Sequence, residues 1–241
     1  MKLKIYSDKH EVAREFSKYL ADFILERKEV HIALSGGSTP KIVFDELALS
    51  YADKIDWRKV HFYWGDERCV PPMDDQSNYK MTVEHLFSKI GIPENNIHRI
   101  LGEKEPFGEA VRYADLLEVN LDRVEHIPQF DLVILGMGDD GHTASIFPHE
   151  IHLWDAHDHC VVATHPESGQ KRVSINGKVI NNAKTVAFLV TGESKAEKVS
   201  EIIDKKGNFT DYPASLVAPR LGELLWFMDK AAAVGLTPGP V

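Results

Sequence analysis

The sequence predicts an α/β fold with a mainly parallel central sheet flanked by helices. Short apolar runs, which are typical of buried strands, alternate with segments whose apolar residues recur at helical spacing. Hydrophobic residues make up 43% of the 241 residues, which is enough for a sizeable core. No linker rich in Gly, Ser or Pro divides the chain, so we expect a single domain over residues 1–241.

The first half of the chain is predicted to alternate strands with helices. A helix is expected from about Val12 to Phe23, where apolar residues recur every three or four positions. Thr39 is the expected N-cap of a second helix, which has Pro40 in its first turn. A third helix is expected at residues 77–87. The strands are expected at residues 3–6, 31–35 and 60–64.

The second half repeats the alternation. Helices are expected at about residues 108–124 and 193–203, and the tail at 235–241 is expected to fray. Strands are expected at residues 130–135, 160–164, 185–190 and 224–228.

Composition and charge argue against several classes of protein. The formal net charge is −9, whereas a nucleic-acid surface needs a dominant basic field. No apolar run approaches the ~20 residues of a membrane span, and the N-terminus lacks the apolar core of a secretory signal. The two cysteines, Cys69 and Cys160, are too few for a disulfide framework. We therefore expect a cytoplasmic protein that binds neither nucleic acid nor membranes.

Three of the predicted strands run into unusual polar sequence. HIALS continues into GGSTP, VHFYW into GDERCVPP, and FDLVIL into GMGDDGH. Sites in parallel sheets form at the carboxyl ends of strands. If the three strands are parallel, the three loops meet at one edge of the sheet and form a site there.

Two of these loops offer groups that could hold an anion. Backbone amides and hydroxyls of Gly36, Gly37, Ser38 and Thr39 stand at a helix start, which is a phosphate-binding combination, although an ordinary tight turn explains them equally well. It is not a Walker loop, because G-K-[ST] is absent. Arg68 could grip a phosphate or form an internal salt bridge.

The third loop contains the spacing G-x-G-x-x-G of a dinucleotide-binding turn. Asp139 and Asp140 would repel a pyrophosphate there, and Pro148 limits any helix after Gly141. We therefore favour a bent loop that presents His142 with Asp140 beside it. Histidine takes and returns protons near neutral pH, so this pair indicates general acid–base chemistry.

Other kinds of site are less well supported. Lys195 stands near a helix start after a predicted strand, where a lysine can meet a phosphate or can simply face solvent. Residues 142–165 contain six histidines, but no zinc-binding spacing such as H-E-x-x-H, so we expect no metal. There is also no G-x-S-x-G elbow, which argues against a serine hydrolase.

Taken together, the motifs resemble those of the 6-phosphogluconolactonase family, within the larger group that includes glucosamine-6-phosphate deaminases. The deaminases show Asp-Glu-Tyr after the third strand and Gly-His-Ile-Ala-Phe-Asn-Glu-Pro after the glycine loop. Here those places contain GDERCVPP and GHTASIFP, which favours the lactonase branch. The matching segments are LSGGSTP, WGDERCVPPMDDQSNY, LGMGDDGHTASIFP, VTGESKAEKV and PASLV, in family order over most of the chain.

The resemblance implies a Rossmann-like α/β domain that hydrolyses 6-phosphoglucono-1,5-lactone to 6-phosphogluconate in the oxidative pentose phosphate pathway, with no cofactor. It implies His142 as general base and Asp140 as its support. Arg68 and Lys195, with Gly36, Gly37, Ser38 and Thr39, match phosphate-binding positions. Arg172 matches a further family arginine, although the segment around it, KRVSINGKVINNA, departs from the family pattern.

Two alternatives stay open from the sequence. The first is a glucosamine-6-phosphate deaminase or sugar-phosphate isomerase on the same fold. The second is a sugar-phosphate-binding protein without catalytic activity. The oligomeric state is not predicted.

Overall fold

Within residues 1–237, which the structure describes, the computed structural model contains a central sheet of seven strands. The strand order is β1-β12-β11-β8-β2-β3-β5, and every neighbouring pair is parallel. Part of the predicted frayed tail, residues 238–241, lies outside the described residues. The strands are β1 (Lys2–Tyr6), β2 (Val30–Leu34), β3 (Val60–Trp64), β5 (Ile97–His98), β8 (Leu132–Leu135), β11 (Thr185–Val190) and β12 (Glu223–Asp229).

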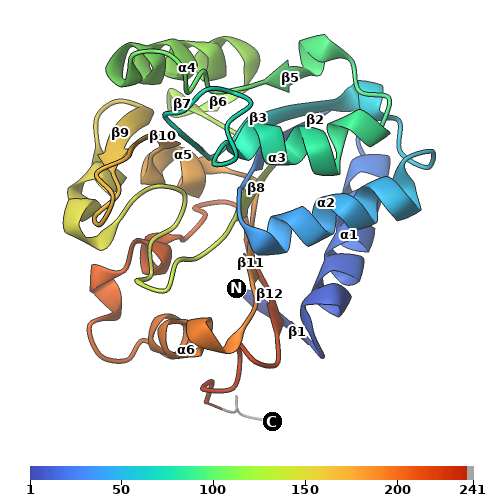
Figure 1. Ribbon diagram of the computed structural model, residues 1–241. Helices are drawn as coiled ribbons and strands as arrows, with labels where there is room; N and C mark the ends of the chain where they lie inside the picture. Colours follow the sequence, from blue (N-terminus) through green and yellow to red (C-terminus); the bar gives the residue numbers. More distant parts are fainter. Residues whose placement is uncertain (238–241) are drawn as a thin grey trace.

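Helices cover both faces of this sheet, as the predicted α/β class requires. In Figure 1, α1, α2 and α3 lie on one side of the sheet, and α4 and α5 lie on the other. None of the helices described is long and apolar enough to cross a membrane. The α-helices are α1 (Lys9–Leu25), α2 (Ser38–Tyr51), α3 (Asn78–His85), α4 (Pro106–Asn120), α5 (Gly177–Asn182) and α6 (Ala196–Ile203). Short 3₁₀ segments lie at Trp57–Lys59, Phe87–Lys89, Glu94–Asn96, Pro148–Asp155, Glu193–Lys195, Phe209–Asp211 and Pro213–Leu216.

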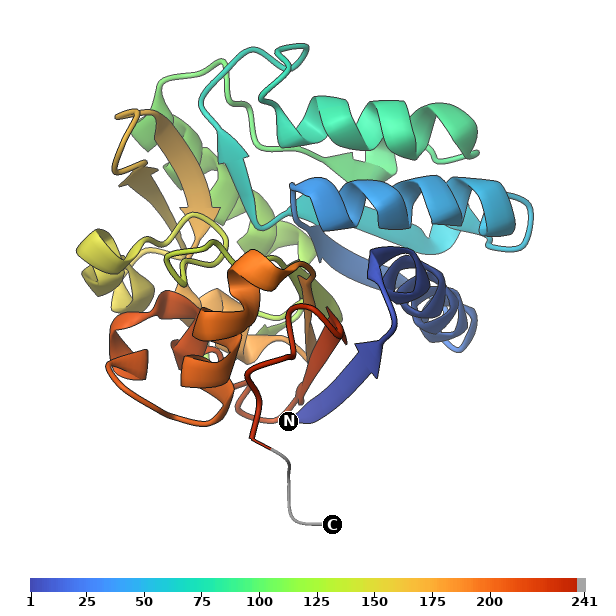
Figure 2. The same ribbon diagram turned by 60° about the horizontal axis from the view of Figure 1, so that its bottom comes forward.

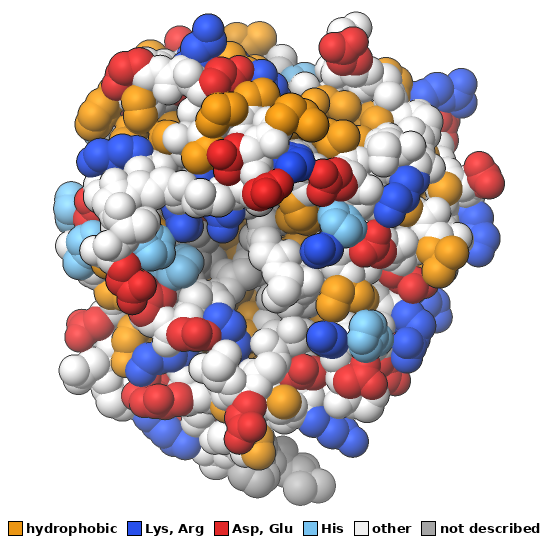
Figure 3. Space-filling view, in the orientation of Figure 1, with side chains coloured by type: hydrophobic (Ala, Val, Ile, Leu, Met, Phe, Trp, Pro, Cys, Tyr) orange, Lys and Arg blue, Asp and Glu red, His pale blue; other side chains and the backbone are white. Residues whose placement is uncertain are grey.

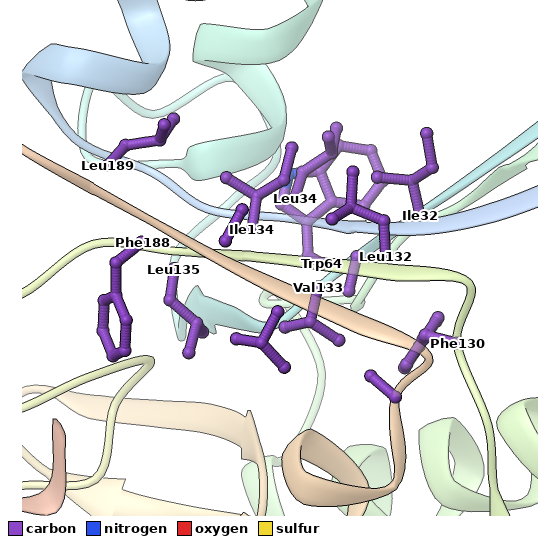
Figure 4. Packing of buried hydrophobic residues seen from close by; sticks show 14 of the residues in the cluster. Ile32, Leu34, Trp64, Phe130, Leu132, Val133, Ile134, Leu135, Phe188 and Leu189 are labelled. Atoms are coloured by element: carbon purple, nitrogen blue, oxygen red, sulfur yellow. The ribbon is translucent and has the colours of Figure 1, made fainter. Parts of the chain in front are cut away.

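The core lies on both faces of the middle strands. All four residues of β8 are buried, which explains why the strand is an unbroken apolar run rather than an alternating one. Figure 4 shows them packed among side chains of the neighbouring strands, including Leu34, Phe188 and Leu189. This rigid centre fixes the directions of the loops that leave the carboxyl ends of the strands.

The strand order reverses between β2 and β8. From β2 the chain builds outward through β3 and β5, whereas from β8 it builds the opposite way through β11 and β12. At such a switch the connections leave toward opposite faces, and a crevice opens between the strand ends. The loops after β2 and β8 are GGSTP and GMGDDGH, so the prediction that these loops meet is confirmed.

A second, antiparallel sheet stands beside the crevice. It contains β4 (Asp66–Arg68), β10 (Lys171–Ile175) and β9 (Cys160–Thr164), and Figure 2 shows it on the side of the molecule away from β1. The predicted strand at 160–164 therefore exists but belongs to this sheet rather than to the parallel one. GDER was expected to be a loop, which is wrong for residues 66–68, and β10 was not predicted. A short hairpin, β6 (Arg123–Val124) and β7 (Ile127–Pro128), forms a third sheet.

The start of α2 also differs from the prediction. Gly37 is the N-cap, and no side chain caps the helix, so Thr39 does not have the expected role. Its hydroxyl instead lies 2.8 Å from the hydroxyl of Thr191, after β11. The residues at the helix start line the crevice, and no capping side chain occupies their backbone amides.

Three histidines stack across β2, β3 and β5. The rings of His31 and His61 are 4.8 Å apart between centroids, and His61 Nδ1 lies 3.0 Å from His98 Nε2. Glu29 Oε1 lies 3.3 Å from His61 Nε2, and the Tyr63 hydroxyl lies 3.2 Å from His31 Nδ1. Burial, and then the charges that His61 and His31 would carry, lower the pKa of His98 to about 4.

We predict that His98→Gln makes the protein less sensitive to acid. The unfolded chain takes up a proton on His98 near pH 6.5 and the folded chain only near pH 4, so the free energy of unfolding falls as the pH drops through this window. Removing the group should reduce that fall by about 1–2 kcal/mol, allowing for partial exposure. Urea unfolding at pH 7, 5.5 and 4.5 measures it. His157→Gln, at an exposed position, is the control. Equal pH dependence in His98→Gln and the parent would contradict the prediction.

Candidate active site

The crevice at the strand switch is a cleft of about 200 Å³. Figure 3 shows the molecule hollowed near the middle of this face, with Lys and Arg side chains around the hollow. The cleft is lined by the loops after β2, β8 and β11 together with β4 and β10. A polar cleft at this place in a parallel sheet is the expected position of a small-molecule site.

The loop after β8 presents His142 beside Asp140. The Gly138 amide donates to the His142 carbonyl, and Gly141, at φ +81°, bends the chain in a way that favours glycine. His142 Nδ1 lies 2.6 Å from Asp140 Oδ1, and the His142 amide donates to the same oxygen at 3.0 Å. Burial opposes ionisation of Asp140, but the hydrogen bonds from His142 outweigh it and lower the pKa of Asp140 to about 2.

Asp140 is therefore a carboxylate at neutral pH and can only accept hydrogen bonds. Nδ1 of His142 then carries the proton of this hydrogen bond, and Nε2 is left to accept one from another group. The pair has the arrangement of a general base and the acid that orients it.

A dinucleotide-binding role for this loop is not supported. The residues after Gly141 form a bridge between Thr143 and Ile146 rather than a helix, and a kinked 3₁₀ segment begins at Pro148. A pyrophosphate would lack the helix N-terminus that such loops use.

The segment around PASLV fastens the loop from outside. The Ala214 amide donates to the Gly141 carbonyl at 3.0 Å. The Tyr212 side chain packs against Gly141, where an added Cβ would lie 2.7 Å from Tyr212 Cβ. This segment is thus a support for His142, since it contacts the loop and does not line the cleft.

Arg68 and Arg172 face the cleft from two adjacent strands of the small sheet, β4 and β10. They are direct partners in the antiparallel register of β4 and β10, so both side chains lie on one face. The Nε atoms of both are buried without a hydrogen-bond partner among the described residues, and both side chains line the cleft. Burial lowers the pKa of Arg172; the charge of Arg68 adds to this effect, and that of Asp66 opposes it. Two such guanidinium groups would be stabilised by an anion.

The loop after β2 completes the wall. An added Cβ at Gly36 would lie 1.9 Å from Asn78 Oδ1, and Gly37 has φ +110°, so the close approach and the turn both need glycine. Ser38 and Thr39 follow in the first turn of α2. These residues line the cleft, and the first backbone amides of a helix have no partner within it, so this helix start suits a negative charge.

Lys195 also lines the cleft, but it already has a partner. Its Nζ lies 2.5 Å from Asp139 Oδ1, and the Ser194 hydroxyl donates to the same oxygen at 3.2 Å. The loop thus contains two adjacent acids with different contacts, Asp140 at His142 and Asp139 at Lys195. The sequence indicated Asp139 only as a charge that would repel pyrophosphate and did not predict its contact with Lys195.

The cleft contains further residues whose role the sequence left open. Asp66 is 5% exposed, lines the cleft and accepts a hydrogen bond from the Ser145 hydroxyl at 2.5 Å. Asn78 and Thr191 line the cleft as well. Glu67 is buried and accepts hydrogen bonds from backbone amides at the start of α3, so it serves as a cap. All three residues belong to the motif WGDERCVPPMDDQSNY. Only the structure shows that Asp66 and Asn78 line the cleft and that Glu67 does not.

The histidine-rich stretch stays largely apart from the cleft. His159 contacts Glu118 at 3.1 Å, and His157 is exposed. His165 packs edge-on against Phe147, which in turn packs against His142. In residues 1–237 no group of three or more His, Cys, Asp or Glu side chains is arranged to hold a metal ion.

The structure brings the predicted site residues together. Asp140 reaches the site through its hydrogen bond to His142. The predicted residues that line one cleft are His142, Gly36, Gly37, Ser38, Thr39, Arg68, Arg172 and Lys195.

Comparison with known proteins gives consistent matches. Residues 8–226 match the family described as glucosamine-6-phosphate isomerases/6-phosphogluconolactonase. The chain is 50% identical over 204 residues to a 6-phosphogluconolactonase of Haemophilus influenzae, covering 84% of this chain and 86% of that one. A solved 6-phosphogluconolactonase from Trypanosoma brucei is 27% identical with a TM-score of 0.87, over 98% of both chains. A monomeric glucosamine-6-phosphate deaminase, 21% identical with a TM-score of 0.83 over 98% of this chain and 100% of that one, shows the shared fold.

We predict that Gly138→Ala separates His142 from Asp140. An added Cβ would lie 2.2 Å from His142 Nδ1 and 2.7 Å from Asp140 Oδ1, so both side chains must shift, which disturbs the hydrogen bond between them. The cost to overall stability should be about 1–3 kcal/mol. NMR of the imidazole nitrogens should show loss of the Nδ1–H hydrogen bond. Gly91→Ala, where an added Cβ meets nothing within 4 Å, is the control. An unchanged His142 signal would contradict the prediction.

Proposed function

The chain belongs to the glucosamine-6-phosphate isomerase/6-phosphogluconolactonase family, and from this premise we propose how its cleft works. Its reaction is the hydrolysis of 6-phosphoglucono-1,5-lactone to 6-phosphogluconate, in the pentose phosphate pathway. The observation that carries the proposed mechanism is the 2.6 Å contact between His142 and Asp140, in a cleft that also contains two unpaired arginine Nε atoms. We also propose that the enzyme acts in the cytoplasm, since Cys69 and Cys160 are both free thiols.

The first step is the activation of water. Nε2 of His142 takes a proton from a water molecule as that water attacks the lactone carbonyl carbon. Asp140 accepts the hydrogen bond from Nδ1 and stabilises the imidazolium that forms. The new carbon–oxygen bond places a negative charge on the carbonyl oxygen, and backbone N–H groups of the cleft loops stabilise that oxyanion.

The second step opens the ring. The tetrahedral intermediate collapses, the bond from C1 to the ring oxygen breaks, and the imidazolium of His142 returns its proton to the departing oxygen. No covalent enzyme intermediate, metal ion or organic cofactor is needed to balance these steps.

The phosphate group is remote from the reacting carbon and serves to orient the substrate. Arg68, Arg172 and Lys195 contribute positive charge, and the start of α2 contributes backbone amides. Holding the phosphate fixes the distance between the lactone carbonyl and His142, which lowers the entropic part of the barrier.

We predict that His142→Ala lowers the rate of lactone opening by about 10²–10⁴-fold while the protein stays folded. The lactone should be generated in place, with chelator present, and its opening compared with the spontaneous rate. His157→Ala, at an exposed position, should keep full activity. A near-normal rate in His142→Ala would refute the general-base assignment. Ammonia release from glucosamine 6-phosphate would indicate deaminase activity instead.

We predict that Arg68→Met mainly raises KM. A charge-assisted hydrogen bond to phosphate contributes about 1.5–3 kcal/mol, which corresponds to roughly a ten- to hundredfold change. The effect should appear in steady-state kinetics with the phosphorylated lactone. Arg58→Met, which removes an exposed arginine paired with Asp56, should leave KM unchanged. An unchanged KM in Arg68→Met would exclude this arginine from the phosphate site.

A further inference from the structure

We propose that Asp139 sets the affinity of the cleft for phosphate by competing with it for Lys195. This inference rests on the proposed function, because it assumes that Lys195 contacts the substrate phosphate. In the ligand-free enzyme the Asp139 carboxylate forms an ion pair with the Lys195 ammonium group. A bound phosphate must share Lys195 with Asp139 or displace it. Asp139 is then an affinity-determining residue at the edge of the site.

The contact between Asp139 and Lys195 joins two adjacent strand ends. Asp139 stands in the loop after β8, and Lys195 ends the 3₁₀ segment that follows β11, the parallel neighbour of β8. The Ser194 hydroxyl donates to the carboxylate oxygen that contacts Lys195. The hydrogen bond from Lys195 lowers the pKa of Asp139, so the carboxylate is charged at neutral pH.

Lys195 differs in this respect from the other cations of the cleft. In the part of the chain that the structure describes, neither Arg68 nor Arg172 forms an ion pair with a carboxylate. Arg68 Nη1 donates to the Gln76 carbonyl, but the charges of both arginines have no carboxylate partner and can be matched by an anion. Lys195, in contrast, already pairs with Asp139. Asp139 is next in the chain to Asp140, which orients His142.

The exposures of the two partners favour competition over a fixed ion pair. The side chain of Lys195 is 22% exposed, whereas that of Asp139 is 68% exposed. An exposed carboxylate loses little when its partner is taken, since surface ion pairs contribute little to stability. A phosphate that carries nearly two charges and is also held by arginines can therefore take Lys195 from it.

The sign of the effect separates competition from simple positioning. If Asp139 competes, its carboxylate holds the Lys195 ammonium group that the phosphate needs, so neutralising Asp139 frees that group and strengthens phosphate binding. If Asp139 only held Lys195 in place, removing it would weaken binding.

The test is the binding of inorganic phosphate to Asp139→Asn, measured by titration calorimetry at constant ionic strength. Competition predicts a Kd about three- to tenfold lower than in the parent enzyme, which is the size expected for removing one partly screened charge. KM for the lactone should fall in the same direction. The gain should vanish when Asp139→Asn is combined with Lys195→Met, because the effect acts through that ammonium group.

Glu193→Gln is the matched control. It removes one negative charge, as Asp139→Asn does, from the 3₁₀ segment that contains Lys195, and Glu193 has no described ion pair with Lys195. Its Kd for phosphate should stay within about twofold of the parent, since exposed charges at a distance are screened.

Each other outcome overturns the inference. A Kd that is unchanged or higher in Asp139→Asn refutes competition, as does an equal gain in Glu193→Gln or a gain that persists in the double variant. If Lys195→Met alone leaves phosphate binding unchanged, the proposed phosphate site is also wrong. If Asp139→Asn does not lower the Kd for phosphate but Lys195→Met raises it, this inference is refuted and the proposed function stands.

Discussion

The reversal of strand order between β2 and β8 is the constraint on which the site depends. Parallel strands that build outward in opposite directions send their helices to opposite faces, so nothing fills the space above the two central strand ends. The glycine-rich loops after β2 and β8 border that space from its two sides. The buried centre of the sheet holds both loops, and the position of His142 relative to the start of α2 follows from it.

The small antiparallel sheet adds charge to a cleft that the central sheet only shapes. The register of β4 and β10 places two arginines side by side, an arrangement that is unfavourable without an anion. The whole chain has a formal net charge of −9, so the positive charge of the cleft is opposite in sign to that of the protein as a whole. The cleft thus offers positive charge to the phosphate of the proposed substrate, while the rest of the surface does not favour polyanions.

Much of the fold and site follows from local pattern, and the parts that do not follow depend on distant partners. Apolar runs located six of the seven central strands and missed the two-residue β5, and the glycines beside His142 located the loop that presents it. β4 and β10 were missed because short strands such as DER have no pattern of their own until they pair. The prediction that Thr39 caps α2 was wrong because its hydroxyl contacts Thr191, which is distant in the chain and cannot be identified as a neighbour from local sequence. Asp139 could be named as an acid, but its contact with Lys195 depends on which strand lies beside β8. That residues 1–241 form one domain stays a prediction.

The position of β12 has a consequence for the order in which the protein can assemble during synthesis. β12 lies between β1 and β11, so β1 has no partner in the sheet until β12, far later in the chain, has been synthesised. The segment that fastens the loop of His142 is likewise made late, at Tyr212 and Ala214. Contacts of such long separation form slowly. Until β12 is in place, Phe16 and Tyr19 of α1 lack the Phe227 ring against which they pack, so the sheet and the support of the His142 loop are completed together.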